Sequence, residues 1–375
     1  MRPARLNLIV FLSTPVSLIF PPLFVAITIK GVIRRFNPLV RNAHLLTIAA
    51  NFWPREIDTN RFPPVRQIYS TDTNTNILVL EHQPKAPSRG QILFLHGLEG
   101  SSDAGYIKSF AHDALLRGFG VHRSNMRTCG GTESLSDTMY HSGLTADTHF
   151  ILRQIHQRHH PDPLFVVGFS LGGNVALKLA GELKEDSFLA GVCAISTPID
   201  LAACVRALDR PSNRLYARRF LARLKERVRH KARLSPQVYS VEGIDSVNGI
   251  WEFDDRYTGP LFGFGNAENY YRTQSAQRFL HAIRTPSLLI HAKDDPIVPW
   301  KIYNHPAFLE NPYLELLLLD HGGHLGFLSR RKPRFWVDGV VLDWMERIVR
   351  QGRDSEITPL LEQTTRVNPE QTIDR

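Results

Sequence analysis

The chain has 375 residues, of which 43% are hydrophobic and 22% are charged, and its formal net charge is +9. This length and apolar content are enough to bury a full core, which excludes intrinsically disordered, collagen-like and small disulfide-stapled proteins. The three cysteines form an odd number without metal-ligand spacing, so we expect reduced thiols in a compartment such as the cytosol.

The first segment, residues 1–35, is expected to associate with a membrane. Residues 6–29 carry no formal charge and have cations on both flanks, and a helix of this length crosses the hydrocarbon core of a bilayer. Pro15, Pro21 and Pro22 would kink such a helix, so an interfacial segment, a cleaved signal peptide and a segment packed on the protein remain alternatives. The slight excess of cations after the apolar run favours a catalytic domain on the cytoplasmic side.

Short apolar runs alternate with helical patterns along the rest of the chain, after an irregular lead-in over residues 30–64. The pattern predicts strands at 65–69, 77–82, 91–96, 119–124, 163–168, 189–196, 287–292 and 313–319. It predicts helices at 106–117, 145–159, 170–183 and 334–349. This alternation is typical of the α/β class, with a mostly parallel central sheet flanked by helices.

About ninety residues separate the last two of the predicted strands from the first six, which is far longer than an ordinary loop. We therefore expect a core made of residues 36–197 and 285–350, interrupted by an inserted helical cap at 198–284. Residues 351–375 are polar and show little periodicity, so we expect a loosely ordered tail there.

The positive charge of the chain is concentrated in the cap. Residues 206–233 contain eleven Lys or Arg and two acidic residues, so this segment alone accounts for the net charge of +9. It is expected to attract anions such as the headgroups of a membrane surface, and a solvated helical face is the alternative. It contains no recognised nucleic-acid motif, so we expect no specific nucleic-acid partner.

A candidate nucleophile lies in the sequence Gly-Phe-Ser-Leu-Gly at residues 168–172. This sequence follows a predicted buried strand and opens a predicted helix, which is the context of a nucleophile elbow. In such a turn the small flanking residues let the backbone pass close to itself, and the serine is held at the start of a helix, whose dipole favours negative charge. Ser170 is therefore the candidate nucleophile; an idle serine in a glycine-rich helix cap is the alternative.

A serine hydroxyl becomes a good nucleophile when an imidazole accepts its proton, and in this arrangement an acid and then a histidine follow the serine. Asp295 lies just after a predicted strand with the usual Asp-x-x-Val spacing, and Asp294 is its rival. His324 follows two glycines after the last predicted strand and is favoured over His321. No third ligand accompanies these histidines, so no metal is expected.

When such a serine attacks a carbonyl, two backbone N–H groups are needed at the point where negative charge develops on the substrate oxygen. We expect one from Leu171, which follows the nucleophile, and one from Leu98 in the turn after the strand at 91–96. His96 in the same turn is expected to brace it. This chemistry needs no cofactor, and none is predicted.

With its motifs in this order, the chain resembles the AB hydrolase-4 (YheT-like) family of α/β hydrolases over residues 36–350. The similarity rests on segments 42–47, 96–102, 140–147, 168–174, 251–254, 269–271 and 292–296. One departure is Thr128, where the family usually has glycine. The resemblance implies an α/β-hydrolase fold with Ser170, Asp295 and His324 as the triad. It also implies esterase or lipase activity, since several membrane-anchored members act on lipid or medium-chain acyl esters.

These observations predict a serine carboxylic ester hydrolase that forms an acyl-enzyme at Ser170 and acts on a small-molecule acyl or lipid ester. They leave open the acyl length, the headgroup and the oligomeric state. Acyl transfer to an alcohol through the same intermediate is one alternative function. A non-catalytic, membrane-associated binding protein is the other, and the complete set of triad residues argues against it.

Overall fold

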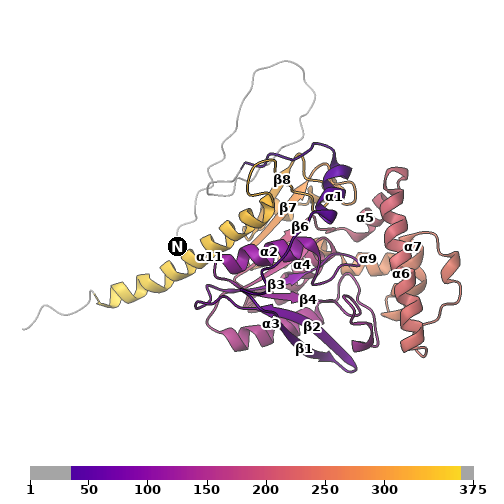
Figure 1. The fold of residues 1–375 in the computed structure, drawn as a ribbon, viewed down its shortest axis with the longest axis horizontal. Helices are drawn as coiled ribbons and strands as arrows, with labels where there is room; N and C mark the ends of the chain where they lie inside the picture. The colour runs from indigo at the N-terminus through magenta and orange to yellow at the C-terminus, as the bar shows by residue number, and fades with distance from the viewer. Residues whose placement is uncertain (1–34, 365–375) are drawn as a thin grey trace, which may run out of the picture.

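The computed structural model describes residues 35–364, with side chains for residues 35–352, and its centre is an eight-stranded sheet (Figure 1). The strand order is β1-β2-β4-β3-β5-β6-β7-β8; β2 is antiparallel to both of its neighbours and all other pairs are parallel. The strands are β1 (Val65–Asp72), β2 (Thr75–His82), β3 (Gln91–Leu95), β4 (Gly120–Ser124), β5 (Leu164–Phe169), β6 (Gly191–Ile195), β7 (Ser287–Ala292) and β8 (Leu314–Leu319). The predicted, mostly parallel sheet is confirmed, and the strand ends differ from the predicted ones by at most three residues.

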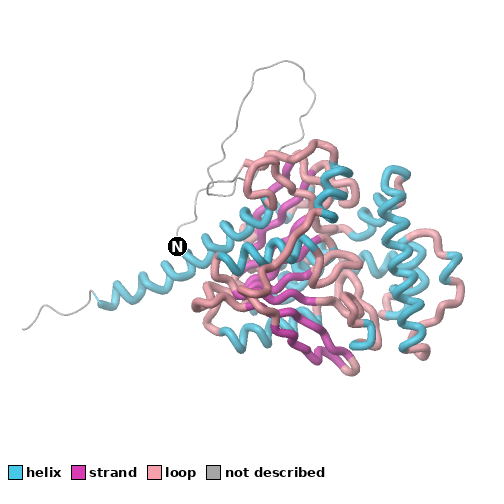
Figure 2. The backbone as a smooth tube through the Cα atoms, viewed as in Figure 1, coloured by secondary structure: helices cyan, strands magenta, loops and turns pink. Residues whose placement is uncertain are grey.

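Helices cover both faces of the sheet, which explains why the central strands are continuous apolar runs (Figure 2). Ile92 and Phe94 of β3 belong to the core under α2 and α11, whereas Leu93 points to the opposite core, under α3 and α4. These helices are α2 (Gly105–Leu116), α3 (Ala146–His159), α4 (Leu171–Leu183) and α11 (Trp336–Thr364).

Helix α11 ends at Thr364, beyond the predicted end at Val349. It therefore runs into the segment 351–375, for which a loosely ordered tail is expected. The physical reason is that starting a helix is costly, whereas each further residue adds a backbone hydrogen bond. The first half of α11 is already fixed in the core by Trp336 and Trp344, so the helix can continue from there (Figure 1).

A second difference concerns the lead-in to the sheet. Residues 43–52, within the segment predicted to be irregular, form helix α1 (Ala43–Phe52), so that prediction is wrong here. Asn42 caps the helix, because its Oδ1 accepts a hydrogen bond of 3.0 Å from the Leu45 N–H. This places α1 beside the loop that follows β8, where Leu46 and Leu328 share a small core.

The residues between β6 and β7 form helices, turns and loops, which lie at one side of the sheet (Figure 1). They occupy the segment 198–284, where a cap is expected, and a core that includes Leu224, Val228 and Phe253 joins the cap to Met139. The helices are α5 (Leu201–Leu208), α6 (Arg214–Leu234), α7 (Ile250–Phe253), α8 (Gly259–Leu261) and α9 (Ala267–Gln274), with a π-helical turn at Asp254–Thr258. One more short helix, α10 (Ala307–Glu310), lies between β7 and β8.

The membrane prediction concerns a part of the chain that the structure does not describe. Segment 6–29 lies outside the described residues, so that expectation stays a prediction. Within residues 35–364, no helix has both the length and the apolar character needed to cross a bilayer. The three cysteines lie in the described part, where all are buried and unpaired.

Candidate active site

Ser170 lies at the turn between β5 and α4, where the chain bends sharply. Its φ of 52° is in the left-handed region, which residues other than glycine seldom adopt. The flanking glycines make this turn possible: a Cβ on Gly168 would collide with the carbonyl of Gly172. A Cβ on Gly172 would collide in turn with the carbonyls of Leu95 and His96 at the end of β3. The backbone thus holds the Ser170 hydroxyl at the C-terminal edge of the sheet.

The structure brings Ser170, His324 and Asp295 together in one hydrogen-bonded line. The Ser170 Oγ lies 3.0 Å from Nε2 of His324, and Nδ1 of His324 lies 2.8 Å from Oδ2 of Asp295. The other carboxylate oxygen of Asp295 accepts hydrogen bonds of 2.8 and 2.9 Å from the N–H groups of Ile297 and Val298. With a proton on Nδ1, the imidazole presents the lone pair of Nε2 to the serine hydroxyl.

The electrostatics of Asp295 favour its charged form. Its side chain has no solvent exposure, and burial alone would raise its pKa. The neighbouring His324 and the backbone N–H of Val298 outweigh that cost and hold the pKa of Asp295 below its ordinary value. The carboxylate is therefore ionised at neutral pH and can stabilise a positive charge on His324.

The rival residues Asp294 and His321 lie in a separate contact. Asp294 accepts a hydrogen bond of 2.9 Å from the Gly323 N–H, and its other oxygen lies 3.1 Å from Nδ1 of His321. Both side chains thus brace the loop that carries His324. Within the described residues, no group of three or more His, Cys, Asp or Glu side chains is arranged to hold a metal ion.

Helix α1 supports the same loop, and sequence reasoning missed this. The His324 N–H donates a hydrogen bond of 2.9 Å to Oγ1 of Thr47, which itself donates to the carbonyl of Ala43. On the other side, the Leu325 N–H donates to Oγ of Ser196 at 3.2 Å. The signal that could have revealed α1 is its capping asparagine, which precedes an apolar helical pattern.

Leu98 lies in the turn after β3 and lines the site next to Ser170. The Gly97 N–H donates to the hydroxyl of Tyr106 at 3.0 Å, and the Glu99 N–H donates to that of Tyr140 at 2.8 Å. Between them, the Leu98 N–H has no acceptor within the part of the chain that the structure describes. The turn therefore leaves one fixed donor unused, beside Ser170.

The second expected donor, the N–H of Leu171, is the first of α4 and also lacks an acceptor among residues 35–352. His96 braces the turn as expected: its Nε2 accepts from the Met126 N–H at 3.0 Å, and its Nδ1 lies 2.8 Å from the Gly97 carbonyl. Burial lowers the pKa of His96 to about 4, so it is neutral and does not compete as a base.

Cap helix α6 contacts the same turn through an ion pair. Nε and Nη2 of Arg227 donate hydrogen bonds of 2.9 and 2.7 Å to the two carboxylate oxygens of Glu99, whose side chain is only 3% exposed. Arg227 also donates to the carbonyl of Thr128 and, at 3.3 Å, to its hydroxyl. Thr128, the position where the family usually has glycine, has a φ of 62°. It therefore keeps the left-handed conformation of a glycine, and the contacts with Arg227 help to offset the strain.

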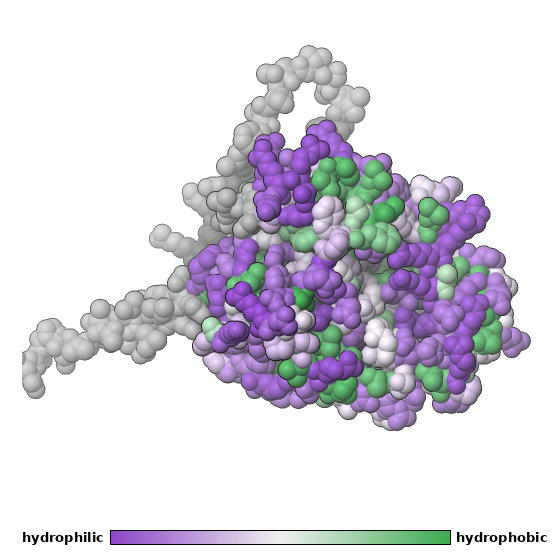
Figure 3. All heavy atoms as spheres, viewed as in Figure 1, coloured by the Kyte–Doolittle hydropathy of each residue, from purple (hydrophilic) through white to green (hydrophobic). Residues whose placement is uncertain are grey.

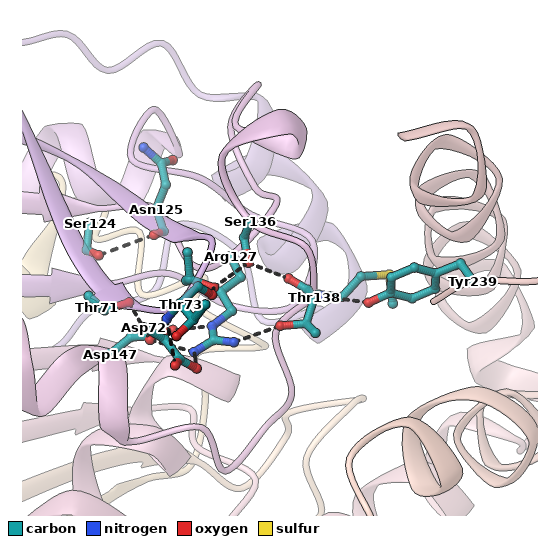
Figure 4. Close-up of polar contacts among 12 residues, drawn as sticks. Thr71, Asp72, Thr73, Ser124, Asn125, Arg127, Ser136, Thr138, Asp147 and Tyr239 are labelled. Atoms are coloured by element: carbon teal, nitrogen blue, oxygen red, sulfur yellow. Dashed lines mark hydrogen bonds and ion pairs between the residues drawn. The ribbon is translucent and has the colours of Figure 1, made fainter. Parts of the chain in front are cut away.

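A buried arginine fixes the segment that follows. Arg127 donates to both oxygens of Asp147 at 2.6 and 2.8 Å and to Oγ1 of Thr138 at 2.7 Å (Figure 4). Tyr239 reaches the same segment from the cap, and its hydroxyl accepts from the Met139 N–H at 2.7 Å. Residues 139–142 are thus held between sheet and cap.

Two hollows meet at Ser170 and His324, which line both of them. The first, here called the apolar pocket, lies under the cap and is partly open to solvent. Its walls come mostly from residues 139–142, α5, α6 and α7; they include Met139, Leu201, Cys204, Val205, Leu208, Leu224 and Phe253. The second, here called the basic cleft, lies between α1, the turn after β3 and α6; its walls include Thr47, Leu98, Glu99, Asp103, Arg219, Arg223 and Arg227.

Comparison with known proteins identifies the fold and the family. The family model of the alpha/beta hydrolase fold matches residues 90–330. The putative esterase YheT of Escherichia coli is 31% identical over 310 residues, which are 81% of this chain and 90% of that protein. The monoacylglycerol lipase of Saccharomyces cerevisiae is 28% identical over 257 residues, and the match spans 66% of this chain but only 57% of that protein. A solved 2,6-dihydroxy-pseudo-oxynicotine hydrolase shares the fold, with a TM-score of 0.52, 19% identity and coverage of 82% of this chain and 72% of that one.

Proposed function

The chain belongs to the AB hydrolase-4 (YheT-like) family of α/β hydrolases, and from this premise we propose that it is a serine carboxylic ester hydrolase acting on acyl or lipid esters. The predicted α/β-hydrolase fold is confirmed. The relatives from Escherichia coli and Saccharomyces cerevisiae are named a putative esterase and a monoacylglycerol lipase. The observation that carries the proposal is the hydrogen-bonded line from Ser170 through His324 to Asp295.

In the first half-reaction, Oγ of Ser170 attacks the ester carbonyl while Nε2 of His324 accepts the hydroxyl proton. The N–H groups of Leu98 and Leu171 donate to the oxygen that becomes negative. His324 then gives its proton to the alcohol oxygen as the bond to the acyl carbon breaks. The acyl group remains bonded to Ser170.

In the second half-reaction, His324 accepts a proton from water, which attacks the acyl carbon. The bond between this carbon and Ser170 breaks, the proton returns to the serine, and a carboxylic acid is released. Asp295 stabilises the imidazolium in both halves and keeps Nδ1 protonated.

The apolar pocket supports an acyl chain as the acid part of the substrate. Hydrophobic side chains from α5 and α6 surround it, and burial of each methylene in such a pocket contributes about 0.8 kcal/mol. The yeast relative is named a monoacylglycerol lipase, which points in the same direction.

We also propose that the enzyme works at a membrane surface, with its catalytic domain on the cytoplasmic side. Segment 6–29 and the basic cap motivate this idea. Leu45, Ile48 and Phe52 of α1 are exposed, and Figure 3 shows hydrophobic surface in that region beside hydrophilic surface. Full-length protein should float with phosphatidylserine-containing vesicles more than with phosphatidylcholine vesicles. Equal absence from both would contradict the proposal.

The hydrolase proposal is tested by labelling with a fluorophosphonate probe, read by intact mass. Wild type should gain one adduct, and Ser170→Ala should lose both the adduct and, by several orders of magnitude, ester turnover. The matched control is Ser212→Ala, which removes an exposed cap hydroxyl and should label like wild type.

Labelling or turnover that survives in Ser170→Ala would contradict the assignment of the nucleophile. A folded wild-type protein that gains no adduct would contradict an activated serine altogether and favour a binding protein. Product analysis with added alcohol separates hydrolysis, which yields a free acid, from acyl transfer, which yields a new ester.

A further inference from the structure

We propose that the basic cleft binds the alcohol part of the ester, and that this alcohol carries an anionic group such as a phosphate. The inference rests on the proposed ester hydrolase function and adds a substrate class to the same site. The products would be a carboxylic acid and an anionic alcohol.

The position of the reacting serine divides the substrate between the two hollows. Ser170 and His324 line both, so an ester carbonyl at Ser170 has its acyl chain on one side and its alcohol on the other. The apolar pocket suits the acyl chain because its walls are mostly hydrophobic. The alcohol is then left to the basic cleft, between α1 and α6.

Contacts at two points along α6 fix its position over this cleft. Toward its start, the hydroxyl of Tyr216 lies 3.1 Å from Nδ1 of His44 on α1. Further along, Arg227 forms its two hydrogen bonds with Glu99. Arg219 and Arg223 lie between these points at intervals of three or four residues, so all four side chains share one face of the helix. The two arginines therefore lie at the wall of the cleft.

The charges of these two arginines are not matched. In the described part of the chain, the only carboxylates that line the cleft are those of Glu99 and Asp103. Glu99 pairs with Arg227, and Asp103 pairs with Arg123 at 3.1 Å.

Arg223 donates a single hydrogen bond, of 3.2 Å, to the carbonyl of Glu99, and Arg219 has no hydrogen-bond or ion-pair partner among residues 35–352. Two arginines with unused donors thus line the cleft. Planar guanidinium forks are well suited to phosphate and carboxylate oxygens.

The reaction itself is unchanged by this binding. The bond between Ser170 and the acyl carbon forms, the bond to the anionic alcohol breaks, and the proton passes from Ser170 through His324 to the alcohol oxygen. Water then releases the acid. The anionic group carries the same charge before and after the ester bond breaks. The arginines should therefore bind the substrate and the transition state equally well, and their effect should appear mainly in KM.

The test compares two soluble esters with the same short acyl chain, 1-hexanoylglycerol and 1-hexanoylglycerol 3-phosphate, both below their aggregation limits. Wild-type full-length enzyme should hydrolyse the hexanoyl ester of the phosphate-bearing compound with a kcat/KM about tenfold higher than that of the neutral compound. This preference should shrink as salt is added. Arg219→Gln/Arg223→Gln should hydrolyse both esters with equal kcat/KM, whereas Arg219→Lys/Arg223→Lys should keep part of the preference. Arg218→Gln, an exposed neighbour outside the cleft, should behave like wild type.

Equal kcat/KM for the two esters in wild type would overturn the proposal, as would a preference that survives in the double Gln variant. A preference found only with esters presented in vesicles would also overturn it, because it would reflect attraction to a charged surface. If a folded enzyme hydrolyses neither ester and Ser170 is not labelled, the ester hydrolase function has failed instead.

Discussion

The apolar pocket and the basic cleft share Ser170 and His324, and α6 lines both. They differ in whether their charged side chains have hydrogen-bond or ion-pair partners. Among the described residues, Asp254 carries the one carboxyl that lines the apolar pocket, and it accepts hydrogen bonds of 2.6 and 2.5 Å from Thr258 and Tyr271. In the basic cleft, two arginines have no carboxylate partner among the described residues. A hollow whose polar groups are satisfied can select by shape, whereas unmatched charge selects by the charge of its ligand.

The largest effect should come from removing the ion pair between α6 and the turn after β3, which lines both hollows. Arg227→Met leaves the Glu99 carboxylate buried without its cationic partner, which should lower the free energy of unfolding by about 3–5 kcal/mol. It should also slow hydrolysis of neutral and anionic esters alike, because the turn that carries Leu98 loses its support. Urea unfolding and steady-state kinetics measure the two effects.

The matched control is Arg229→Met, on the same helix. Arg229 also forms an ion pair, at 2.5 Å, but its partner Asp245 is 88% exposed. Removing this pair should cost at most about 1 kcal/mol. Equal losses in the two variants would show that burial of the Glu99 carboxylate does not matter.

The next largest effect is a change of stability with pH, caused by ionisation of Asp254 in the apolar pocket. Burial raises the pKa of Asp254 to about 6, so the folded protein favours the neutral carboxyl. The stability that the wild type gains from this group is complete below the unfolded pKa, near 4, and is lost as the pH rises through 6. Asp254→Asn should therefore become more stable relative to wild type by up to about 3 kcal/mol between pH 4 and pH 7.5.

Urea unfolding of both proteins at several pH values checks this expectation. Asp255→Asn is the control, since it makes the same change at the neighbouring residue, which is exposed. A stability difference between Asp254→Asn and wild type that stays constant over this range would contradict a raised pKa in the apolar pocket.

The smallest of the three effects is expected from a substitution that fills part of the apolar pocket. Cys204→Phe should exclude about three methylenes of a decanoyl chain, which at about 0.8 kcal/mol each corresponds to roughly a 60-fold loss in kcat/KM. An acetyl ester of the same alcohol should be affected far less, and Cys204→Ala should retain the preference for the longer ester. Equal losses on decanoyl and acetyl esters would place the acyl chain elsewhere.

The sheet and the residues Ser170, His324 and Asp295 could be predicted from the sequence, because each is marked by a local sequence pattern. Each buried strand is a short apolar run, and Ser170 lies in a turn that needs glycine at fixed positions. The spacing after the strands favoured Asp295 and His324, and these are the residues that the structure brings to Ser170.

Other features depend on contacts between distant parts of the chain, which no local pattern reveals. Thr47 supports His324 across 277 positions, and Arg227 reaches Glu99 across 128. The basic segment 206–233 looks uniform in sequence. In the folded cap, some of its cations have carboxylate partners, such as Arg229, whereas others, such as Arg223, have none within residues 35–352.

The contact between Thr47 and His324 has a practical consequence for shortening the chain. The sheet begins at Val65, so a version that starts just before β1 would contain every strand. It would still lack α1, and the backbone of the His324 loop would lose the hydroxyl that accepts its N–H. A shortened protein that keeps the support of the His324 loop must therefore start at or before Asn42, so that it includes the whole of α1.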